Sequence, residues 1–455
     1  MSSRPGATRP TDDGPVFTVE GGRCLVGRVR VPGDKSVSHR ALLLGALASG
    51  QSVVRGLSDG DDVARTAAAT RALGARVDVE PISGSTRISG GPAGLRQPDG
   101  ALDSGNSGTT MRLLAGIVAG QPFTTQLTGD ASLSSRPMDR VAAPLRQMGA
   151  DITGRTERCL PPLTIRGGAL RGIDYTTPMA SAQVKACILL AGLGAEGETV
   201  VREPVLTRLH TEEMLTRCGA RLTEEDTDGG GHVVRLLPSE LAPFELDVPG
   251  DPSQAAFWVV AACVVPDSVV TVERVYVGRG RRGYLDVLAR MGADVVEAPV
   301  TGPGDLATTA DIVARYGPLR ATEVHASEIT GLDEVPVLAV AAACAAGDTV
   351  FRDVGELRVK ESDRMAGVAA LLAVFGARAE VEGDDLWVHG AGRLVPGALH
   401  AHGDHRMAMA AAVAGLAAGE GPTHIAGWAA VATSYPQFPA HLASLTGGTQ
   451  VSEHP

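Results

Sequence analysis

Residues 31–47, VPGDKSVSHRALLLGAL, place a polar turn directly before an apolar run. The first turn of a helix has unpaired backbone N–H groups and a partial positive charge, so it attracts anions. Lys35, Ser36 and Arg40 stand in this turn and would strengthen that attraction. The stretch therefore predicts an anion site at a helix N-terminus. Taken alone, it is explained more simply by a solvated helix start in which Ser36 or Ser38 is the N-cap.

The same order of residues recurs along the chain. Each copy has a polar loop, a helix rich in Ala, Leu and Val, a Gly or Pro break and a β-branched strand. The copies are spaced by about 75 residues, which is longer than a solenoid repeat and long enough for a small α/β unit. Five copies continue into a second helix that ends at Gly and turns into a strand, as in RALGARVDV (71–79) and RQMGADITG (146–154). The six polar loops begin near residues 32, 104, 179, 249, 332 and 402.

The repeats also predict how the chain divides into domains. The sixth copy stops short near residue 455, and a strand-like segment, residues 16–31, precedes the first copy. We expect this N-terminal strand to complete the last unit, so that the chain leaves one domain, builds a second and returns. The prediction is a disordered, Pro-rich tail over residues 1–15, a first domain over residues 16–30 and 249–455, and an inserted second domain over residues 31–248.

The composition excludes several classes of protein. The net charge of −11 argues against general nucleic-acid binding, which needs a basic surface. No apolar run approaches the roughly 20 residues of a membrane-spanning helix, and residues 1–15 lack the apolar core of a signal peptide. The six cysteines are scattered without a CxxC pair, so we expect reduced thiols in a cytoplasmic protein and no metal site.

Cations and small polar residues stand at the start of the helices in most copies, although the fourth loop, PGDPSQAAF, has no cation. Each loop alone could be a helix cap or a solvated helix start. When the loops are considered together, capping or solvation explains them less well, because the same residue types recur at the equivalent point of each unit. Arg guanidinium groups at these points would bind carboxylate or phosphate through paired hydrogen bonds. The candidates are Lys35, Ser36, Arg40, Asn106, Gly108, Arg112, Arg136, Ser181, Gln183, Lys185, Arg208, His210, Asp333, Lys360, Glu361, Arg364, Asp404, His405 and Arg406.

Seven segments, in order, resemble the 5-enolpyruvylshikimate-3-phosphate synthase family. They are PGDKSVSHRALLL, DSGNSGTTMRLL, SRPMDRVAAPLRQMGA, ASAQVKACILLAG, LDEVPVLAVAAA, ELRVKESDRM and GDHRMAMA, and the resemblance runs from residue 20 to residue 442. It implies an α/β fold of two inside-out barrels with pseudo-threefold symmetry, in which each domain has three βαβαββ units with helices buried inside the sheets.

The resemblance also implies an enzyme, a 3-phosphoshikimate 1-carboxyvinyltransferase. Such an enzyme transfers the enolpyruvyl group of phosphoenolpyruvate to the 5-hydroxyl of shikimate 3-phosphate, through a tetrahedral intermediate, and releases phosphate in the shikimate pathway. It uses no metal and no cofactor. We expect a monomer whose partners are these two small substrates.

Roles for individual residues follow from the same resemblance, with the active site in the cleft between the domains. Asp333 would take the proton from the 5-hydroxyl, and Lys35 and Glu361 are the two candidates for protonating the methylene carbon, because an acid and a base must act on opposite sides of the substrate. Shikimate 3-phosphate would be held by Lys35, Ser36, Arg40, Ser181, Gln183, Arg208, Asp333 and Lys360. Phosphoenolpyruvate would be held by Lys35, Gly108, Arg136, Gln183, Arg364, His405 and Arg406.

Four positions depart from the family pattern. Thr433 replaces a Lys found in many members, and Leu113 follows Arg112 where glyphosate-sensitive members have Pro. Ala182 replaces a second phosphate-binding Ser of some members, and Glu356 replaces an Asn. These departures leave the finer ligand contacts and the response to glyphosate open.

Three alternatives compete with this interpretation. The sister family, UDP-N-acetylglucosamine enolpyruvyl transferase, usually has a Cys in its reactive loop, and the corresponding loop here, GDASLSSRPMDR, has none. A catalytically inactive sensor would lack Asp333, Glu361 or Lys35, and all three are present. A paralogue that acts on a related cyclic acid is compatible with the sequence.

Overall fold

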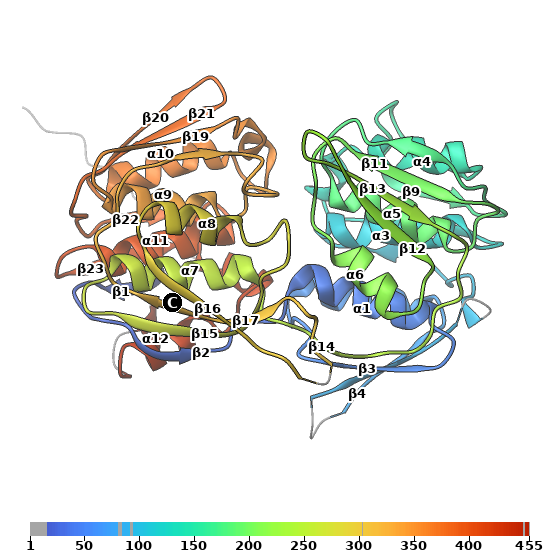
Figure 1. The fold of residues 1–455 in the computed structure, drawn as a ribbon, viewed down its shortest axis with the longest axis horizontal. Helices are drawn as coiled ribbons and strands as arrows, with labels where there is room; N and C mark the ends of the chain where they lie inside the picture. Colours follow the sequence, from blue (N-terminus) through green and yellow to red (C-terminus); the bar gives the residue numbers. More distant parts are fainter. Residues whose placement is uncertain (1–15, 81–83, 92–93, 303, 449–450, 455) are drawn as a thin grey trace, which may run out of the picture.

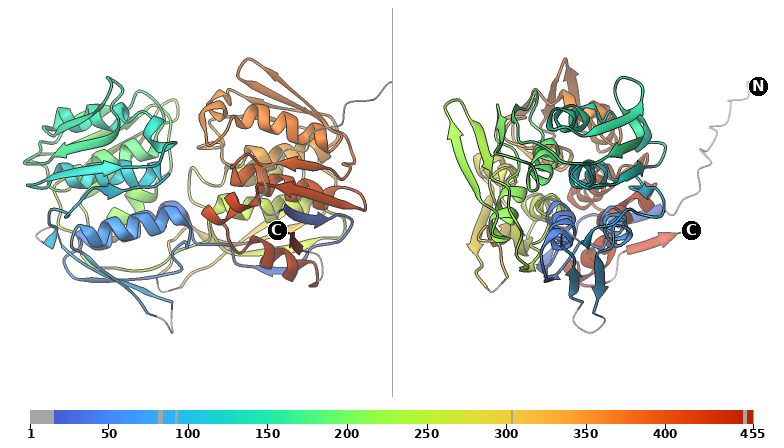
Figure 2. Two further views of the ribbon diagram at one scale, coloured as in Figure 1. Left: turned by 180° about the vertical axis from the view of Figure 1, so that it is seen from behind. Right: turned by 90° about the vertical axis from the view of Figure 1, so that its right-hand side faces the viewer.

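The computed structural model describes residues 16–80, 84–91, 94–302, 304–448 and 451–454. The chain forms two lobes that lie side by side (Figures 1 and 2). We call the lobe of residues 34–248 the inserted lobe, and the lobe of residues 16–31 and 251–454 the discontinuous lobe. The predicted tail, residues 1–15, lies outside the described residues.

The inserted lobe contains three four-stranded sheets with one pattern of pairing. In each sheet the first two strands are parallel and the other two pairs are antiparallel. The sheets are β14 (Glu245–Asp247), β3 (Gln51–Arg55), β5 (Thr86–Ser89) and β4 (Arg76–Val79); β6 (Leu102–Asp103), β7 (Thr124–Thr128), β9 (Leu160–Arg166) and β8 (Asp151–Arg155); and β10 (Asp174–Thr176), β11 (Thr199–Glu203), β13 (Gly231–Leu236) and β12 (Leu222–Thr227).

The discontinuous lobe repeats this pattern in three further sheets. Its strand β1 pairs with β23, so the N-terminal strand completes the last unit, as predicted. The sheets are β2 (Val26–Val29), β15 (Val269–Tyr276), β17 (Thr309–Arg315) and β16 (Asp294–Pro299); β18 (Glu323–His325), β19 (Asp348–Arg352), β21 (Asp385–His389) and β20 (Arg378–Glu382); and β22 (Ala398–His400), β23 (Pro422–Ala426), β1 (Val16–Glu20) and β24 (Val451–His454).

Two sets of helices connect these strands. The inner set is α1 (Lys35–Leu47), α3 (Gly108–Ala119), α5 (Ala182–Gly192), α7 (Pro252–Val264), α9 (Val335–Cys344) and α11 (His405–Ala417). The outer set is α2 (Asp61–Ala72), α4 (Asp139–Met148), α6 (His210–Arg217), α8 (Gly283–Arg290), α10 (Arg364–Val374) and α12 (Phe438–Leu445), with short 3₁₀ helices η2 (Leu133–Ser135), η3 (Gly355–Val359) and η4 (Trp428–Thr433). Among the described residues, no helix has the length and apolarity that crossing a membrane requires.

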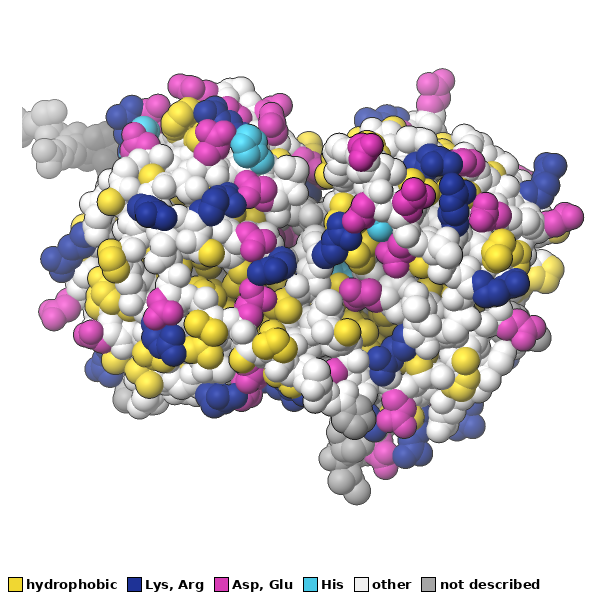
Figure 3. Space-filling model, viewed as in Figure 1, with side chains coloured by type: hydrophobic (Ala, Val, Ile, Leu, Met, Phe, Trp, Pro, Cys, Tyr) yellow, Lys and Arg dark blue, Asp and Glu magenta, His cyan; other side chains and the backbone are white. Residues whose placement is uncertain are grey.

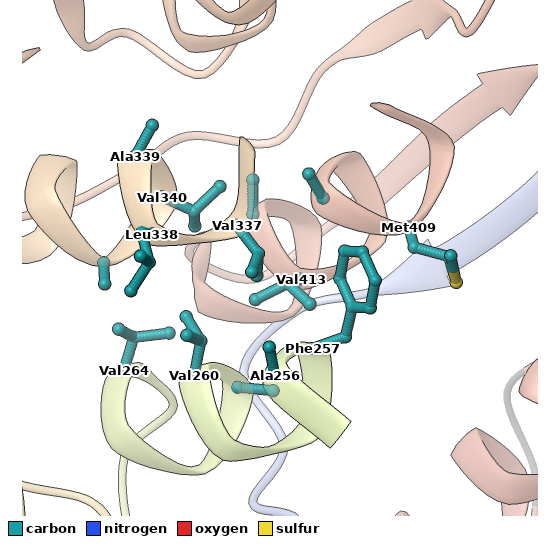
Figure 4. Packing of buried hydrophobic residues seen from close by; sticks show 14 of the residues in the cluster. Ala256, Phe257, Val260, Val264, Val337, Leu338, Ala339, Val340, Met409 and Val413 are labelled. Atoms are coloured by element: carbon teal, nitrogen blue, oxygen red, sulfur yellow. The ribbon is translucent and has the colours of Figure 1, made fainter. Parts of the chain in front are cut away.

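Each lobe has its own hydrophobic core around its inner helices. In the discontinuous lobe α7, α9 and α11 pack together through side chains that include Val260, Val337 and Val413 (Figure 4). All residues of α7 are buried. A helix that is apolar on all sides is stable only when it is covered on all sides, and the strands of the lobe pack against these helices. The sheets remain separate, and none closes on itself within the described part of the chain.

The chain passes between the lobes twice, each time through the sequence VPGD. The two copies run antiparallel: the Asp34 N–H donates to the Pro249 carbonyl (2.7 Å) and the Asp251 N–H donates to the Pro32 carbonyl (2.9 Å). Each Asp then caps the helix that follows, α1 in the inserted lobe and α7 in the discontinuous lobe. The lobes are therefore joined by a pair of hydrogen-bonded strands and not by free linkers.

The sixth unit is more complete than the sequence predicts. A second helix, α12, follows its inner helix, and the last strand, β24, pairs with β1. The segment LASLTGG, which ends α12, lacks the Gly-Ala pair at which the other five outer helices end. Gly447 and Gly448 both have positive φ angles and form the turn instead.

The crossing segments leave no room for a side chain at Gly33. A Cβ there would lie 2.0 Å from the Gly56 carbonyl oxygen and 3.0 Å from Val248 Cγ1, so the backbone would have to move. We expect Gly33→Ala to lower the free energy of unfolding by about 2 kcal/mol, measured by chemical denaturation. Gly100→Ala is the control, because its Cβ would meet nothing within 4 Å. Equal denaturation midpoints for the two variants would contradict the tight crossing.

Candidate active site

The side chain that caps α1 is not one of the predicted serines. Asp34 Oδ1 accepts a hydrogen bond from the Val37 N–H at 2.8 Å, and the Ser38 hydroxyl donates to the Asp34 carbonyl. Ser36 therefore has no capping role, which removes the simpler explanation for its place beside Lys35. Other inner helices are capped by Ser107, Ser181, Asp251 and Asp404.

Asp333 lies where the two lobes meet. Its Oδ2 is 2.9 Å from Arg208 Nη2 of the inserted lobe, and its Oδ1 is 3.4 Å from both Arg364 Nη1 and Arg406 Nε of the discontinuous lobe. Burial opposes the charge, but Arg406, Arg208 and Arg364 together hold the pKa of Asp333 well below its usual value. Glu334, not Asp333, stands at the N-cap position of α9, and its side chain makes no capping bond. Helix capping therefore does not explain why an Asp occupies position 333.

Arg364 is fully buried and binds two further carboxylates. Its Nε donates to Asp404 Oδ2 at 2.8 Å, and its Nη2 lies 2.6 Å from Glu361 Oε2. Burial works against the cation, but Glu361 and Asp404 raise the pKa of Arg364 above its usual value. Burial likewise works against the Glu361 carboxylate, but Arg364 together with smaller contributions that include Arg406 outweighs burial, so the pKa of Glu361 is lowered. Glu361 is therefore ionised at neutral pH.

Lys35 is held from both lobes. Its Nζ is 3.0 Å from Asp62 Oδ2, and its backbone N–H donates to Asp251 Oδ2 at 3.1 Å. Burial alone would lower the pKa of Lys35, but the Asp62 carboxylate, together with Glu361, more than offsets burial and raises it. Nearby, burial together with Arg406 and Lys35 lowers the pKa of His405 to about 3. Lys35 is thus protonated and His405 neutral at neutral pH.

Arg40 lies buried beneath the N-terminus of its own helix. Its Nε donates to Thr211 Oγ1 at 2.7 Å, and its Nη1 donates to the Ser36 carbonyl at 2.9 Å. Burial lowers the pKa of Arg40 to about 10, which leaves it charged at neutral pH. These bonds connect α1 to α6 and fix the guanidinium next to Ser36.

The N-terminus of α3 carries a second group of polar side chains. Arg112 Nη1 donates to Gln183 Oε1 at 2.5 Å, and Arg136 Nη2 donates to Asn106 Oδ1 at 2.7 Å. A Cβ at Gly108 would lie 2.8 Å from Arg112 Nη1, so glycine leaves this helix end open. The structure thus brings Gln183 of one unit to the helix start of the preceding unit.

Two predicted residues stand apart from these contacts. Ser181 Oγ accepts from the Val184 N–H at 3.4 Å as a helix cap, and the described hydrogen bonds do not join it to Arg208. Lys360 Nζ pairs with Glu356 Oε1 at 3.0 Å, although its charge also helps to lower the pKa of Asp333. In the described contacts, neither residue forms an ion pair or hydrogen bond with Asp333 or Arg208.

Several residues of the network were not singled out for a role in the sequence. Asp62 stands beside Asp61 at the start of an outer helix, where acidic residues are common because they complement the helix dipole. Thr211 follows the noted pair Arg208 and His210 and looks like an ordinary helix residue. The sequence does show that Asp62 and Thr211 lie near the polar loop of a unit. This position does not show which residue each of them will contact.

One cluster in the inserted lobe has the composition of a metal site. Ligand atoms of Glu212, Glu224 and His232 lie within 4.8 Å of one another, a grouping that spacing in the sequence did not predict. The buried Lys185 ammonium already lies 2.5 Å from Glu212 and 2.7 Å from Glu203, and both ring nitrogens of His232 contact carboxylates. Lys185 thus supplies the positive charge that a metal ion would bring, and the residues do not fit a metal. The six cysteines are free thiols.

The assembled site can bind a ligand with several negative groups. Arg208 crosses from the inserted lobe to both Asp333 and the Thr330 carbonyl (3.1 Å) of the other lobe. Figure 3 shows a hollow between the lobes on the face that it displays. The cations come from both sides, and the site offers a protonated amine, Lys35, together with an ionised carboxylate, Asp333. An acid and a base placed in this way can donate a proton to a bound polyanion and accept a proton from it.

Comparison with known proteins places this site in a family. The sequence matches the family model of EPSP synthase (3-phosphoshikimate 1-carboxyvinyltransferase) over residues 19–442. A 3-phosphoshikimate 1-carboxyvinyltransferase from Gloeobacter violaceus is 52% identical over 95% of this chain and 99% of its own length, and one from Herpetosiphon aurantiacus is 46% identical over 94% and 99%.

Solved structures agree with the sequence comparison. EPSP synthase from Acinetobacter baumannii has a TM-score of 0.86 and 40% identity, covering 97% of this chain and 100% of that one. The enolpyruvyl transferase NikO from Streptomyces tendae, at 21% identity, has the same mixed α/β fold, with a TM-score of 0.75 over 97% of this chain and 99% of that one. The chain therefore belongs to the EPSP synthase family.

Proposed function

We propose that this chain is a 3-phosphoshikimate 1-carboxyvinyltransferase of the shikimate pathway, which leads to the aromatic amino acids. It transfers the enolpyruvyl group of phosphoenolpyruvate to the 5-hydroxyl of shikimate 3-phosphate by addition and elimination, and it releases phosphate. Family membership over nearly the whole chain supports the reaction. The observation that carries the assignment of the site is Asp333, a carboxylate that caps no helix and is held by arginines from both lobes.

The donor, phosphoenolpyruvate, would bind between the lobes. Arg364 and Arg406 of the discontinuous lobe and Arg136 of the inserted lobe would clamp its charged groups, because guanidinium forks match carboxylate and phosphate geometry. Lys35 would approach its phosphate, and the open helix start at Gly108 would add backbone N–H donors. Gln183 and His405 would complete this pocket.

The acceptor, shikimate 3-phosphate, would bind mainly to the inserted lobe. Arg40 is fixed next to Ser36 by hydrogen bonds, which suits recognition of the acceptor's carboxylate. Arg208 would bind its phosphate together with Ser181. The remaining contacts would come from Lys35, Gln183, Asp333 and Lys360.

Arg208 links acceptor binding to the preparation of the base. Arg208 pairs with Asp333 at 2.9 Å, and a carboxylate whose pKa is far below its usual value is a weak base. A phosphate carries more charge than a carboxylate and would compete for Arg208. When Arg208 turns to the phosphate, Asp333 loses one of its three cations and its pKa rises. The acceptor thus prepares the carboxylate that deprotonates its 5-hydroxyl.

Lys35 is the acid in this proposal, and Glu361 is not. The pKa of Lys35 is raised, so Lys35 holds a proton at neutral pH, whereas Glu361 is ionised and paired with Arg364. Lys35 can therefore protonate the methylene carbon without any prior change of partner. Asp62 is the residue that keeps Lys35 charged.

The two lobes would be the two domains of the family fold, residues 16–30 with 249–455 and residues 31–248. Each would be an inside-out barrel with pseudo-threefold symmetry, in which three separate sheets enclose three inner helices. Two hydrophobic cores support this division, and among the described residues only Tyr276 and Leu306 of the first domain join the core of the second. We infer that a monomer in the cytoplasm closes its two domains on the substrates, since the proposed ligand groups come from both.

The first test is the reaction itself. The purified protein should release phosphate from phosphoenolpyruvate when shikimate 3-phosphate is present, and not when UDP-N-acetylglucosamine replaces it. The reason is the family match and the absence of a Cys from residues 129–140. A chelator should not change the rate. Comparable turnover with the nucleotide sugar would overturn the assignment.

Replacing Asp333 by Asn tests the base. Asp333→Asn should lower kcat by about a hundredfold or more in steady-state assays, because an amide cannot accept the proton. Folding should be kept, since Arg364 retains Asp404 and Glu361 as partners. Asp363→Asn is the matched control: Asp363 caps α10 through the Ala366 N–H, and Asn caps nearly as well. If Asp333→Asn kept most of its turnover, Asp333 would not be the base.

Replacing Asp62 by Asn tests the acid through the pH profile. Without that carboxylate, burial would lower the pKa of Lys35, so Lys35 would lose its proton at lower pH than in the wild type. We expect the alkaline limb of kcat to move toward neutral pH by about one unit or more. Asp61→Asn, at an exposed position on the same turn, should leave the limb in place. An unmoved limb in Asp62→Asn, with Glu361→Gln inactive, would assign the proton to Glu361.

A further inference from the structure

Arg281 is a buried cation that none of the substrate roles uses. It lies in the turn between β15 and α8, and 2% of its side chain is exposed. Its Nη2 donates to Asp251 Oδ1 at 2.8 Å and to Ser253 Oγ at 2.9 Å, and its Nη1 donates to Glu334 Oε1 at 3.3 Å. A buried arginine with this many partners organises the groups around it.

The partners of Arg281 hold the two helix starts that carry the proposed acid and base. Asp251 Oδ2 accepts the backbone N–H of Lys35 across the crossing segments, at 3.1 Å. Glu334 follows Asp333 in the chain, and its Oε1 also accepts from the Ser253 hydroxyl. Two partners of Arg281 thus lie next to the ends of the proposed proton transfer: Asp251 is hydrogen-bonded to the Lys35 backbone, and Glu334 adjoins Asp333 in the chain.

A third acidic group faces Arg281 without a hydrogen bond. Asp34 Oδ2 is fully buried, lies 3.7 Å from Arg281 Nη2 and 3.8 Å from His210 Nε2, and has no hydrogen-bond partner within the described residues. Asp34 belongs to the inserted lobe and caps α1, directly before Lys35. A shift of less than about 1 Å would bring this oxygen into hydrogen-bond range of Arg281.

We propose that Arg281 is a positioning residue for the reaction: it holds Lys35 and Asp333 at a set separation across the crossing, and it gains Asp34 as a further hydrogen-bond partner when the lobes close. The inference rests on the proposed roles of Lys35 and Asp333. It assigns Arg281 to the state in which both lobes contact phosphoenolpyruvate, while Ser36, Arg40 and Ser181, which Arg281 does not contact, hold the acceptor without it.

Arg281→Lys tests the proposal, because lysine keeps the charge and loses the planar fork that reaches several partners. We expect the KM for phosphoenolpyruvate to rise about tenfold and kcat to fall about tenfold, since both depend on the closed arrangement. The Kd for shikimate 3-phosphate alone, from calorimetry, should change less than about twofold. Arg282→Lys is the control, because Arg282 is half exposed and pairs with Glu297 and Asp286 outside the crossing.

A second pair of variants separates positioning from stability. Arg281→Met should lower the melting temperature, because it leaves Asp34, Asp251 and Glu334 buried without their cation. Adding Glu334→Gln should recover part of the melting temperature and none of the kinetic loss. Recovery of both together, or wild-type KM and kcat in Arg281→Lys, would overturn the proposal.

Two reference variants separate this inference from the proposed function. If Lys35→Met and Asp333→Asn lose turnover while Arg281→Lys does not, the roles of Lys35 and Asp333 stand and the role of Arg281 fails. If Lys35→Met and Asp333→Asn keep turnover, the proposed roles fail, and the inference fails with them.

Discussion

The antiparallel pairing of the two VPGD segments is the constraint on which the rest of the structure depends. Each Asp bonds through its backbone N–H to the opposite Pro carbonyl and through its side chain to the helix that it begins. One inner helix of each lobe therefore starts at the same point. The partial positive charge of both helix ends is concentrated there, beside the groups proposed to bind anions. A crossing through loose linkers would not hold Lys35 against Asp251.

Charge balance decides how so many ionised side chains can be buried in this site. A buried cation without a partner is costly. Arg364 accordingly lies against Asp333, Glu361 and Asp404, and Lys185 lies against two glutamates, whereas Arg40 has a hydroxyl and a backbone carbonyl as partners. A substrate anion that binds Arg364 would therefore compete with a protein carboxylate, and one that binds Arg40 would not. Under the proposed roles, binding of the acceptor phosphate to Arg208 would release one side of Asp333, whereas Lys35 is paired with Asp62 and not with an arginine.

The sequence predicts the repeated α/β units, but it does not predict which charged residues pair with each other. Helices made of Ala, Val and Leu on every face must be covered on every face, so the inner helices, the recurring strands and the return of the N-terminal strand were all predictable from the repeat. Asp62 and Asp34 were not, because an acidic residue at a helix start is common for reasons of capping alone. Arg208 and Asp333 are far apart in the chain and meet only because it crosses twice. The outer helix α12 was missed because its end uses Gly447 and Gly448 without the repeated pattern.

The pair of Arg208 and Asp333 would give the proposed reaction a preferred order of events. While Arg208 is paired with Asp333, the pKa of the carboxylate is held well below its usual value, so a donor that binds first would meet a weak base. Under the proposed roles, an acceptor that binds first would draw Arg208 to its phosphate, free one side of Asp333 and leave Arg364 and Arg406 for the donor. The same step would replace an ion pair that joins the lobes with a ligand that both lobes contact. Acceptor binding would therefore exchange a fixed connection between the lobes for one that exists only when the substrate is present, so the reactive arrangement and the occupied site would coincide.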